Sequence, residues 1–349
     1  MRFSTMIWPF SGATLAPVVE LAKFADSHGY DTVYIGDSQM LWNDVWVALG
    51  MCAMATTRVR LGPGVTNTVT RHPAVTANAI MSVNMASNGR AVLGVGAGDS
   101  AVRTAGLSPA KLAEIRAALT YMQALLAAAE VAPLVQLGER REGTWGMVNK
   151  VHLEGASSWG NIPFEMACMG PKAVELAGEL CAGVIVDGHM GGNAEGARAT
   201  VDAAARGAAK AGRDPSTLRF IAAIDGAVED QRGPALDQVR QTAARNIARK
   251  PYLPACIGVE HAESVRAVSD AYKFYQHLDL TAKHRHLVPD AVAMKCCIAG
   301  TPEDCIAKAK ELAGAGITDI AVFVTAQDLA ASRRKLERFA AEVMPYVCT

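Results

Sequence analysis

The groups able to do chemistry in this sequence fall in short segments that follow β-branched runs. The segment MGPKAVELAG ends one such run at Gly170, and Pro171 suits the first turn of a helix. Backbone N–H groups at such a helix start, beside the Lys172 ammonium, form a candidate phosphate site; an ordinary turn with a solvated lysine is an equal alternative. The segment GVGAGDS, with Gly98 and Ser100, is a weaker candidate for a second loop of this kind.

Four side chains near such segments can move protons: Asp37, His72, Asp99 and His189. Each also has a structural alternative, because the aspartates can cap helices or form ion pairs and His72, directly before a proline, can hold a loop. No nucleophile elbow and no CxxC pair is present, and the first strand contains no His. His284 and His286 have HxH spacing but lie in the irregular, basic second insertion, so neither serine hydrolysis nor a metal site is predicted. Lys295, before CCIAG, is a weak candidate for a Schiff-base lysine.

These segments need a scaffold, and the chain predicts one by alternating short β-branched strands with longer Ala/Leu-rich helices. The expected strands are RFSTMIW, DTVYIG, VRLGPGV, AVLGVG, PFEMACM, GVIVDG, LRFIAAI and TDIAVFV. Eight strands close a parallel sheet, so the predicted fold is an α/β TIM barrel, (β/α)8, with insertions. An open doubly wound sheet is the alternative, but WPFSGATL after the first strand lacks the GxGxxG fingerprint.

In such barrels the functional residues lie where strands end, and glycine occupies most of these ends here. We expect one domain over 1–349, with insertions at about 131–161 and 251–290. Glycines and short strand-like pieces mark the first insertion, and the basic-aromatic run YKFYQHLDLTAKHRH lies in the second. Lids over the barrel mouth and packing in a dimer are equal alternatives for both insertions.

Composition excludes several classes of protein. The 34 Lys and Arg balance the 34 Asp and Glu, so the strong positive charge typical of nucleic-acid binding is missing. No apolar run is long enough for a membrane span, and we expect no membrane partner. Eight scattered cysteines without paired spacing indicate reduced thiols and a cytoplasmic location. We expect Cys296 and Cys297 to lie in a strand with one thiol on each face.

Three longer stretches resemble a known family. They are GPGVTNTVTRHPAVTANAIMSVNMASNGRAVLGVGAGDSAVRTAGL, MGPKAVELAGELCAGVIVDG and IAGTPEDCIAKAKELAGAGITDIAVF. Together they resemble the bacterial luciferase-like superfamily of flavin and deazaflavin oxidoreductases, and within it the methylenetetrahydromethanopterin reductase branch. The resemblance covers most of the chain and is weakest across 131–160 and 251–290.

The resemblance implies a homodimeric TIM barrel that binds FMN or the 5-deazaflavin coenzyme F-420 at its mouth. It implies a non-prolyl cis peptide bond between Gly64 and Val65, behind the flat ring of the cofactor. The cofactor-binding residues it implies are Gly64, Val65, Thr66, Asn67, Gly98, Ser100, Gly170, Pro171, Lys172 and Asp187, and the catalytic candidates are Asp37, Asp99 and His72.

One departure affects the catalytic residues. Several deazaflavin-dependent relatives carry an Asp-His pair after the second strand, whereas this chain has Asp37 followed by Ser38. The function implied is hydride transfer between the cofactor and a small organic substrate. The alternatives are an FMN-dependent luciferase-like monooxygenase, a phosphate-binding barrel lyase or aldolase using Lys295, and a non-catalytic flavin-binding protein.

Overall fold

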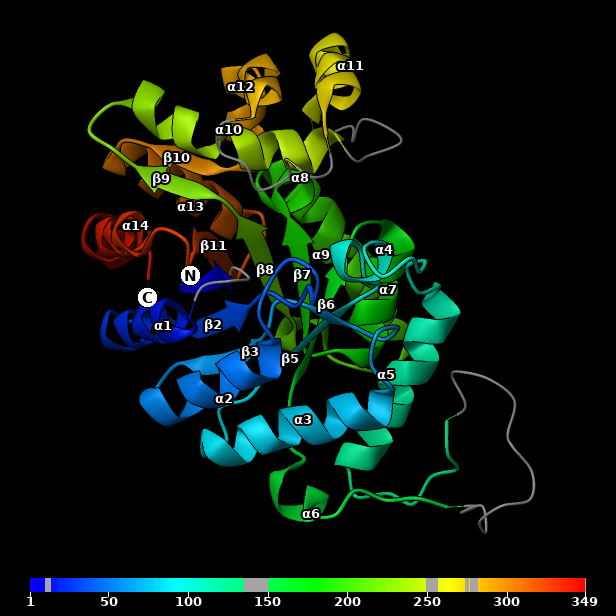
Figure 1. The fold of residues 1–349 in the computed structure, drawn as a ribbon. Helices are drawn as coiled ribbons and strands as arrows, with labels where there is room; N and C mark the ends of the chain where they lie inside the picture. Colours follow the sequence, from blue (N-terminus) through cyan, green and yellow to red (C-terminus); the bar gives the residue numbers. More distant parts are fainter. Residues whose placement is uncertain (10–13, 135–149, 249–256, 274–275, 277–281, 349) are drawn as a thin grey trace.

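The computed structural model describes residues 1–9, 14–134, 150–248, 257–273, 276 and 282–348 (Figure 1). Its centre is a nearly closed parallel barrel, and the prediction of a TIM barrel is confirmed. The barrel strands, in spatial order, are β3 (Arg60–Pro63), β2 (Thr32–Ile35), β1 (Arg2–Trp8), β11 (Asp319–Thr325), β8 (Arg219–Ile224), β7 (Gly183–Asp187), β6 (Phe164–Cys168), β5 (Leu93–Gly96) and β4 (Thr66–Asn67).

The third predicted strand is present in two pieces, β3 and β4, which flank Gly64 and Val65. The Gly64–Val65 peptide bond is cis, at the position that the family resemblance implied. A parallel bridge from Leu61 to Ala91 joins β3 to the chain entering β5 and so completes the ring. Gly64 faces the barrel interior, where a Cβ atom would lie 2.6 Å from the Cβ of Tyr34. This close packing explains the glycine.

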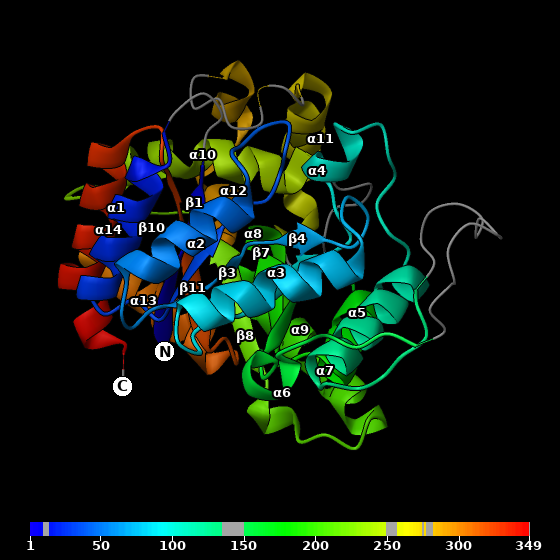
Figure 2. The same ribbon diagram turned by 60° about the horizontal axis from the view of Figure 1, so that its bottom comes forward.

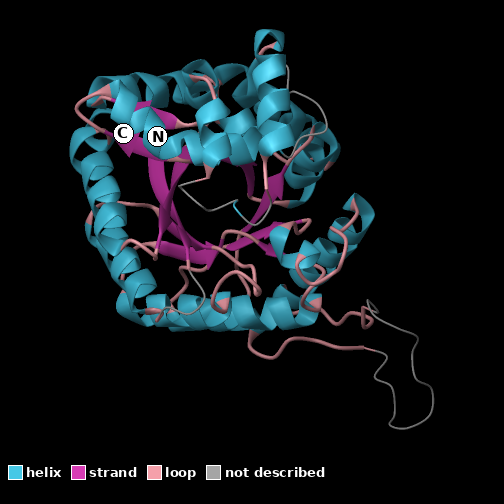
Figure 3. Ribbon diagram, turned by 45° about the horizontal axis from the view of Figure 1, so that its top comes forward, coloured by secondary structure: helices cyan, strands magenta, loops and turns pink. Residues whose placement is uncertain are grey.

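Helices surround the strands, which form the inner ring in Figure 3. The main apolar core lies between the two layers, as expected for amphipathic helices on a parallel sheet. The surrounding helices are α1 (Ala16–Ser27), α2 (Val45–Ala55), α3 (Pro73–Ala86), α5 (Leu112–Leu126), α7 (Pro171–Leu180), α9 (Ala194–Lys210), α13 (Pro302–Gly314) and α14 (Leu329–Glu342), with the shorter α4 (Ser100–Arg103), α6 (Ala156–Trp159) and α8 (Gly188–Gly191).

The end of the barrel where the strands begin is closed by a network of buried charges. Tyr34 donates a hydrogen bond of 2.5 Å to Oε2 of Glu165, whose other oxygen lies 3.4 Å from the Arg60 guanidinium. Arg219 bonds Asp31 at 2.7 Å and also contacts Asp319. Burial raises the pKa of Glu165 to about 8, against the effect of the Tyr34 hydrogen bond. We call this network the basal network; its charged members are Arg2, Asp31, Arg60, Glu165, Arg219 and Asp319.

A second unit stands at the opposite end of the barrel. After β8 the chain forms β9 (Gly226–Val228), which pairs in parallel with β10 (Ile298–Gly300) outside the barrel sheet. Between these strands lie α10 (Arg232–Ala248), α11 (Ala262–Ala271) and α12 (Asp290–Cys296), gathered beside α8 in Figure 1. They share a separate apolar cluster built on residues such as Val239, Ile247 and Val292. We call this part the satellite unit.

The satellite unit corrects two expectations. Cys296 ends α12 and Cys297 precedes β10, and both are buried, so the expected strand with a thiol on each face is wrong. Lys295 lies on α12 rather than on a strand, and its ammonium donates to the Ile257 carbonyl at 2.7 Å. The wrong prediction arose because CCIAG was assigned entirely to a strand, whereas the strand starts at Ile298.

The two expected insertions are described in part. In the first, Val131 and Val151 form an antiparallel bridge and α6 follows, while 135–149 lies outside the described residues. In the second, α11 and a 3-10 turn over Lys283–Leu287 are described, while 249–256, 274–275 and 277–281 lie outside. None of the described helices is long and apolar enough to cross a membrane.

Candidate active site

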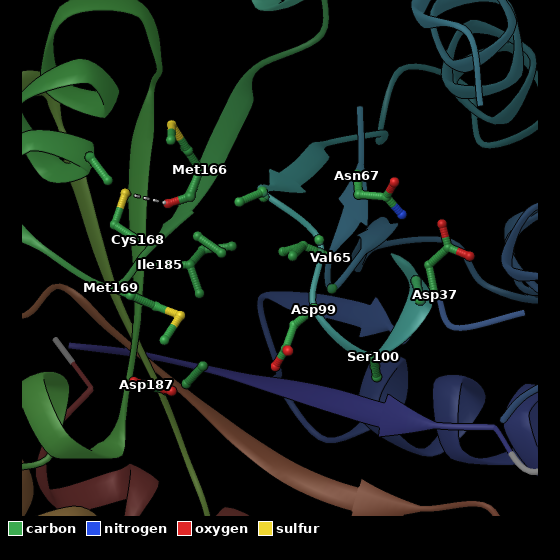
Figure 4. A pocket seen from close by; sticks show the side chains of 18 of the residues that line it. Asp37, Val65, Asn67, Asp99, Ser100, Met166, Cys168, Met169, Ile185 and Asp187 are labelled. Carbon is green, nitrogen blue, oxygen red and sulfur yellow. Dashed lines mark hydrogen bonds between the residues drawn. The ribbon is translucent and has the colours of Figure 1, made fainter. Parts of the chain in front are cut away.

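A cavity of about 370 Å³ opens at the carboxyl ends of the barrel strands (Figure 4). Side chains from β1, β6, β7 and β11 line it together with the turns that follow β2, β3 and β5. Its volume falls within the range of small-molecule sites, roughly 300–1,000 Å³, and its lining is mostly apolar with a few polar groups. The strand-end rule applied to the sequence therefore identifies the correct region.

One wall is built on the Gly64–Val65 bulge. Val65 lines the cavity and packs over Gly96, where a Cβ atom would lie 3.1 Å from the Val65 Cγ2. The Asn67 side-chain oxygen accepts hydrogen bonds from the N–H groups of Val69 (3.0 Å) and Thr70 (2.8 Å), which fixes the turn after β4. The Asn67 amide nitrogen is buried at the cavity wall and has no hydrogen-bond partner among the described residues. It is a donor available to a ligand.

Asp37 stands beside this wall and is held by two donors. Arg71 lies 2.5 Å from one carboxylate oxygen, and the Thr66 hydroxyl donates to the same oxygen at 2.7 Å. The Asp37 side chain is only 2% exposed. Arg71 also contacts Asp44. Burial is the largest single influence on the pKa of Arg71 and lowers it, but the Asp37 and Asp44 carboxylates together raise that pKa above its usual value. Asp37 is therefore part of a tight ion pair at the rim.

The loop after β5 forms the next part of the wall. Gly98 has a φ of +83°, a left-handed conformation that favours glycine, and a Cβ there would lie 2.6 Å from Val102. The Ser100 and Ser38 hydroxyls are 2.6 Å apart and join this loop to the one after β2. Asp99 lies 2.9 Å from Arg103, one turn along the chain, and its side chain is 39% exposed.

The start of α7 borders the cavity at the end of β6. Gly170 is the N-cap residue of α7, and no side chain caps the N–H groups of the first turn of this helix. Gly170 and Ala173 line the cavity. Beside them, the thiol of Cys168 donates to the Met166 carbonyl at 3.4 Å (Figure 4). The positive end of the ten-residue α7 thus borders the cavity, as an anion site requires.

The facing wall is aromatic and carries a guanidinium. The rings of Trp8 and Phe323 lie 4.8 Å apart, and Trp42 stacks on Trp8 at 6.3 Å. The Arg245 guanidinium, from α10, lies 4.8 Å from the Trp8 ring and 5.1 Å from the Phe323 ring. Burial lowers the pKa of Arg245, and the nearby Asp187 carboxylate opposes that change. Asn246 is 2% exposed, and neither of its amide atoms has a hydrogen-bond partner among the described residues.

Most of the proton carriers and cofactor-binding residues predicted from the sequence meet at this cavity, and five do not line it. His189 lies on α8 behind the wall, with its Nδ1 2.5 Å from Oδ1 of Asp187. His72 caps α3 instead: its Nδ1 accepts from the Ala74 N–H at 3.2 Å, and its Nε2 lies 2.7 Å from the Leu134 carbonyl oxygen. Thr66 stands behind Asp37. Pro171 and Lys172 are exposed at the start of α7. The predicted residues that line the cavity are Asp37, Gly64, Val65, Asn67, Gly98, Asp99, Ser100, Gly170 and Asp187.

Sequence reasoning missed the aromatic wall and the two α10 residues. Trp8 and Phe323 lie at the carboxyl ends of β1 and β11, so the strand-end rule could have included them. Arg245 and Asn246 lie near the end of a long helix, where no local sequence signal marks contact with the barrel mouth. A larger cavity of about 690 Å³ shares Trp8 and Phe323, but polar groups on its wall pair with one another, as Lys335 does with Asp225 at 2.8 Å.

Comparison with known proteins decides the family. A family model described as luciferase-like monooxygenase matches residues 1–319. The chain belongs to the luciferase-like monooxygenase family. It is 32% identical over 305 residues to a 5,10-methylenetetrahydromethanopterin reductase from Methanolobus tindarius, across 87% of this chain and 88% of the relative. The chain is therefore a luciferase-like oxidoreductase, in the branch that the sequence resemblance indicated.

Other relatives extend the comparison. The chain is 25% identical over 337 residues to an F420-dependent glucose-6-phosphate dehydrogenase from Beutenbergia cavernae, across 92% of this chain and 90% of the relative. The solved coenzyme F420 dependent tetrahydromethanopterin reductase from Methanopyrus kandleri superposes with a TM-score of 0.81 at 22% identity, over 99% of this chain and 100% of that one. The structural match supports the barrel fold.

Lys295 lies outside the cavity, which removes the sequence argument for a Schiff-base lyase.

Proposed function

We propose that the protein transfers hydride between coenzyme F-420 and a small organic substrate at the barrel mouth. The observation that carries the proposal is the wall formed by Val65, Asn67 and Gly98. It offers an apolar surface and a buried donor that has no partner within the described part of the chain. The names of the F420-dependent dehydrogenase and of the solved coenzyme F420 dependent reductase support the deazaflavin over FMN. Bound there, the cofactor would supply the hydride chemistry.

The described residues fit such a group. A flat tricyclic ring needs an apolar platform, which Val65 provides, and polar edge atoms need a donor, which the Asn67 amide nitrogen provides. A phosphate-bearing tail would meet the first turn of α7, where Gly170 lets the chain approach closely and Lys172 adds a positive charge at the surface. The aromatic wall of Trp8 and Phe323 would then face the substrate and exclude water.

Separate titrations with F-420 and FMN test the proposal, followed by protein fluorescence and the cofactor absorption band. We expect F-420 to bind with a Kd in the micromolar range and FMN at least about tenfold more weakly. Binding of neither below about 1 mM would contradict the proposal. Tighter binding of FMN would favour the FMN-dependent monooxygenase instead, which oxygen consumption with reduced FMN would then check. Turnover is measured with methylenetetrahydromethanopterin and with glucose 6-phosphate.

We also propose that the protein forms a homodimer through α2 and α3, which lie side by side in Figure 2. Neither helix contains a charged residue. Val47, Met51 and Met54 form an exposed stripe at helical spacing on α2, and Val75 and Met85 are exposed on α3. Uncharged apolar faces of this kind mark protein interfaces, and a two-fold axis would pair the face with itself.

The oligomeric state tests the interface. We expect a dimer by light scattering after size exclusion, and a monomer when Met51→Glu and Met54→Lys are combined. Val259→Glu is the matched control, because Val259 is 84% exposed on a turn away from these helices. A dimer that survives the double substitution, or a wild-type monomer, would refute this interface.

A further inference from the structure

Three carboxylates line the cavity, and two of them are held by guanidinium groups. Arg71 lies 2.5 Å from Asp37, and Arg103 lies 2.9 Å from Asp99. An arginine keeps its charge at every physiological pH, so it stabilises the ionised form of its carboxylate partner. Both of these carboxylates are therefore engaged by an arginine side chain.

The third carboxylate, Asp187, has a different partner. Its Oδ1 lies 2.5 Å from Nδ1 of His189, and the Asp187 side chain is 34% exposed while that of His189 is 2% exposed. Figure 4 places Asp187 on the β6–β7 wall, with Asp37 and Asn67 on the other side. Histidine is the side chain whose charge changes near neutral pH, so an Asp-His pair can hold one exchangeable proton and present it through its exposed member.

The surroundings hold the pair in place. His189 lies on α8, where Gly188 packs against the Cys296 carbonyl and the Asn246 amide; a Cβ at Gly188 would lie 2.5 Å from the Asn246 nitrogen. α8 packs against α9, α10, α12, β7 and β8. The charged groups on or next to these elements include Arg245 on α10, Asp225 after β8 and Lys295 on α12, while Glu195 and Arg198 at the start of α9 are exposed. Asp225 is bonded by Lys335, and the Lys295 ammonium donates to the Ile257 carbonyl, so each has a partner of its own.

The neighbours on α10 complete a polar subsite. The Arg245 guanidinium carbon lies 4.8 Å from the Trp8 ring and 5.1 Å from the Phe323 ring, and a guanidinium carries five N–H donors. Asn246 is buried with both amide atoms lacking partners among the described residues, which is costly unless a ligand supplies them. These two side chains and Asp187 line the same cavity. A substrate with an oxygen or nitrogen next to its reacting carbon would contact the Arg245 and Asn246 donors and the Asp187 carboxyl group at the same place.

We propose that Asp187 is the catalytic acid–base of the hydride transfer and that His189 is its positioning residue. This inference rests on the proposed function. In the reductive direction the O–H bond of Asp187 breaks and the proton bonds to the substrate oxygen or nitrogen. Bound in the cavity, the reduced deazaflavin would supply the hydride, and with it both electrons, to the adjacent carbon. Asp187, the exposed member of the pair, then recovers a proton from solvent while His189 holds its carboxyl group in place. Oxidation reverses each step.

Kinetics of Asp187→Asn provide the first test. We expect kcat to fall about 10²–10⁴-fold, the range for loss of a general acid, with KM little changed. The Kd of F-420, followed by its absorption band, should stay within about threefold of wild type. Asp202→Asn, an exposed aspartate on α9, is the matched control and should turn over as wild type does. Retention of kcat within about threefold in Asp187→Asn would overturn the proposal.

His189→Gln tests the positioning role. Glutamine keeps a polar side chain but cannot carry a proton, so we expect the alkaline side of the profile of kcat against pH to move relative to wild type. A histidine with a merely structural role would lower kcat or stability without moving the pH profile. An unmoved profile would overturn the assignment of His189.

A readout without cofactor separates this proposal from the proposed function. In the free protein, Asp187→Asn should move the nitrogen NMR signals of the His189 ring and leave those of His72 in place. Unmoved His189 signals would overturn the pair. A Kd for F-420 raised more than about tenfold with normal kcat at saturation would show Asp187 to be a cofactor ligand instead, which also overturns the proposal. If wild type binds neither cofactor, the proposed function itself fails.

Discussion

The two ends of the barrel use charge in opposite ways. At the end where the strands begin, the basal network neutralises each buried charge with one or more partners, and Glu165 and Asp319 are fully buried. At the mouth, one cationic side chain, Arg245, and three carboxylates line the cavity among the described residues, beside amide atoms without partners. Breaking a buried ion pair is costly, although Arg219 Nε has no hydrogen-bond partner among the described residues, whereas unsatisfied groups around a cavity are typical of binding sites. The contrast separates a structural end from a functional end.

Arg219→Met at the basal end should produce the largest effect. It removes the partner of Asp31 and Asp319 while leaving their carboxylates in place, and an uncompensated buried charge costs about 3–5 kcal/mol. We expect the free energy of unfolding in urea to fall by that amount, and the F-420 affinity of the folded fraction to stay unchanged. A loss below about 1 kcal/mol would show that the basal network does little for stability.

Glu165→Gln should change how stability depends on pH. The pKa of Glu165 in the folded state, about 8, lies above the ordinary value of 4.5 for a glutamate, so the folded state binds the proton more tightly. The stability gained from that proton is complete below pH 4.5 and is lost as the pH rises towards 8. Between pH 5.5 and 7.5 the loss is roughly 2–3 kcal/mol. Urea unfolding across this range should show the decline in wild type and a flatter curve in Glu165→Gln; parallel curves would contradict it.

Lys172→Ala at the mouth should leave stability unchanged and weaken cofactor binding. Lys172 is exposed at the start of α7, so its loss removes one charge from the proposed phosphate site. We expect the Kd of F-420 to rise about tenfold, equivalent to about 1.4 kcal/mol, with the same urea midpoint. Lys310→Ala on α13, also exposed, is the matched control. Equal affinities for the two variants would place the phosphate elsewhere.

Sequence patterns predicted the barrel because alternating strands and helices dictate it, and the turn from Gly64 to Asn67 follows from the strand-end rule. They failed where a role depends on distant packing. His72 could be placed near the mouth, but only the structure shows that both ring nitrogens face backbone atoms. Arg245 could not be found at all, because its helix reaches the mouth through the pairing of β9 with β10, two segments about 70 residues apart.

The basal network also escaped prediction, although its residues share a sequence signal. Arg2, Arg60 and Arg219 are each the first residue of a strand, and Asp319 begins β11. Charged residues at strand starts are read as solvated ends when each strand is considered alone. Their mutual pairing arises when barrel closure brings the starts together.

The satellite unit divides the mouth between two hydrophobic cores. Val65, Asn67 and Gly170 are held by the barrel, whereas Arg245 and Asn246 belong to a helix whose apolar face packs in the satellite cluster. Substitutions that reshape one half of the mouth can therefore be absorbed by a small core of its own, without repacking the barrel. In evolutionary terms the two halves are separately variable. Substitutions on α10 could change the groups that contact the substrate, while the barrel residues that contact the cofactor are inherited unchanged.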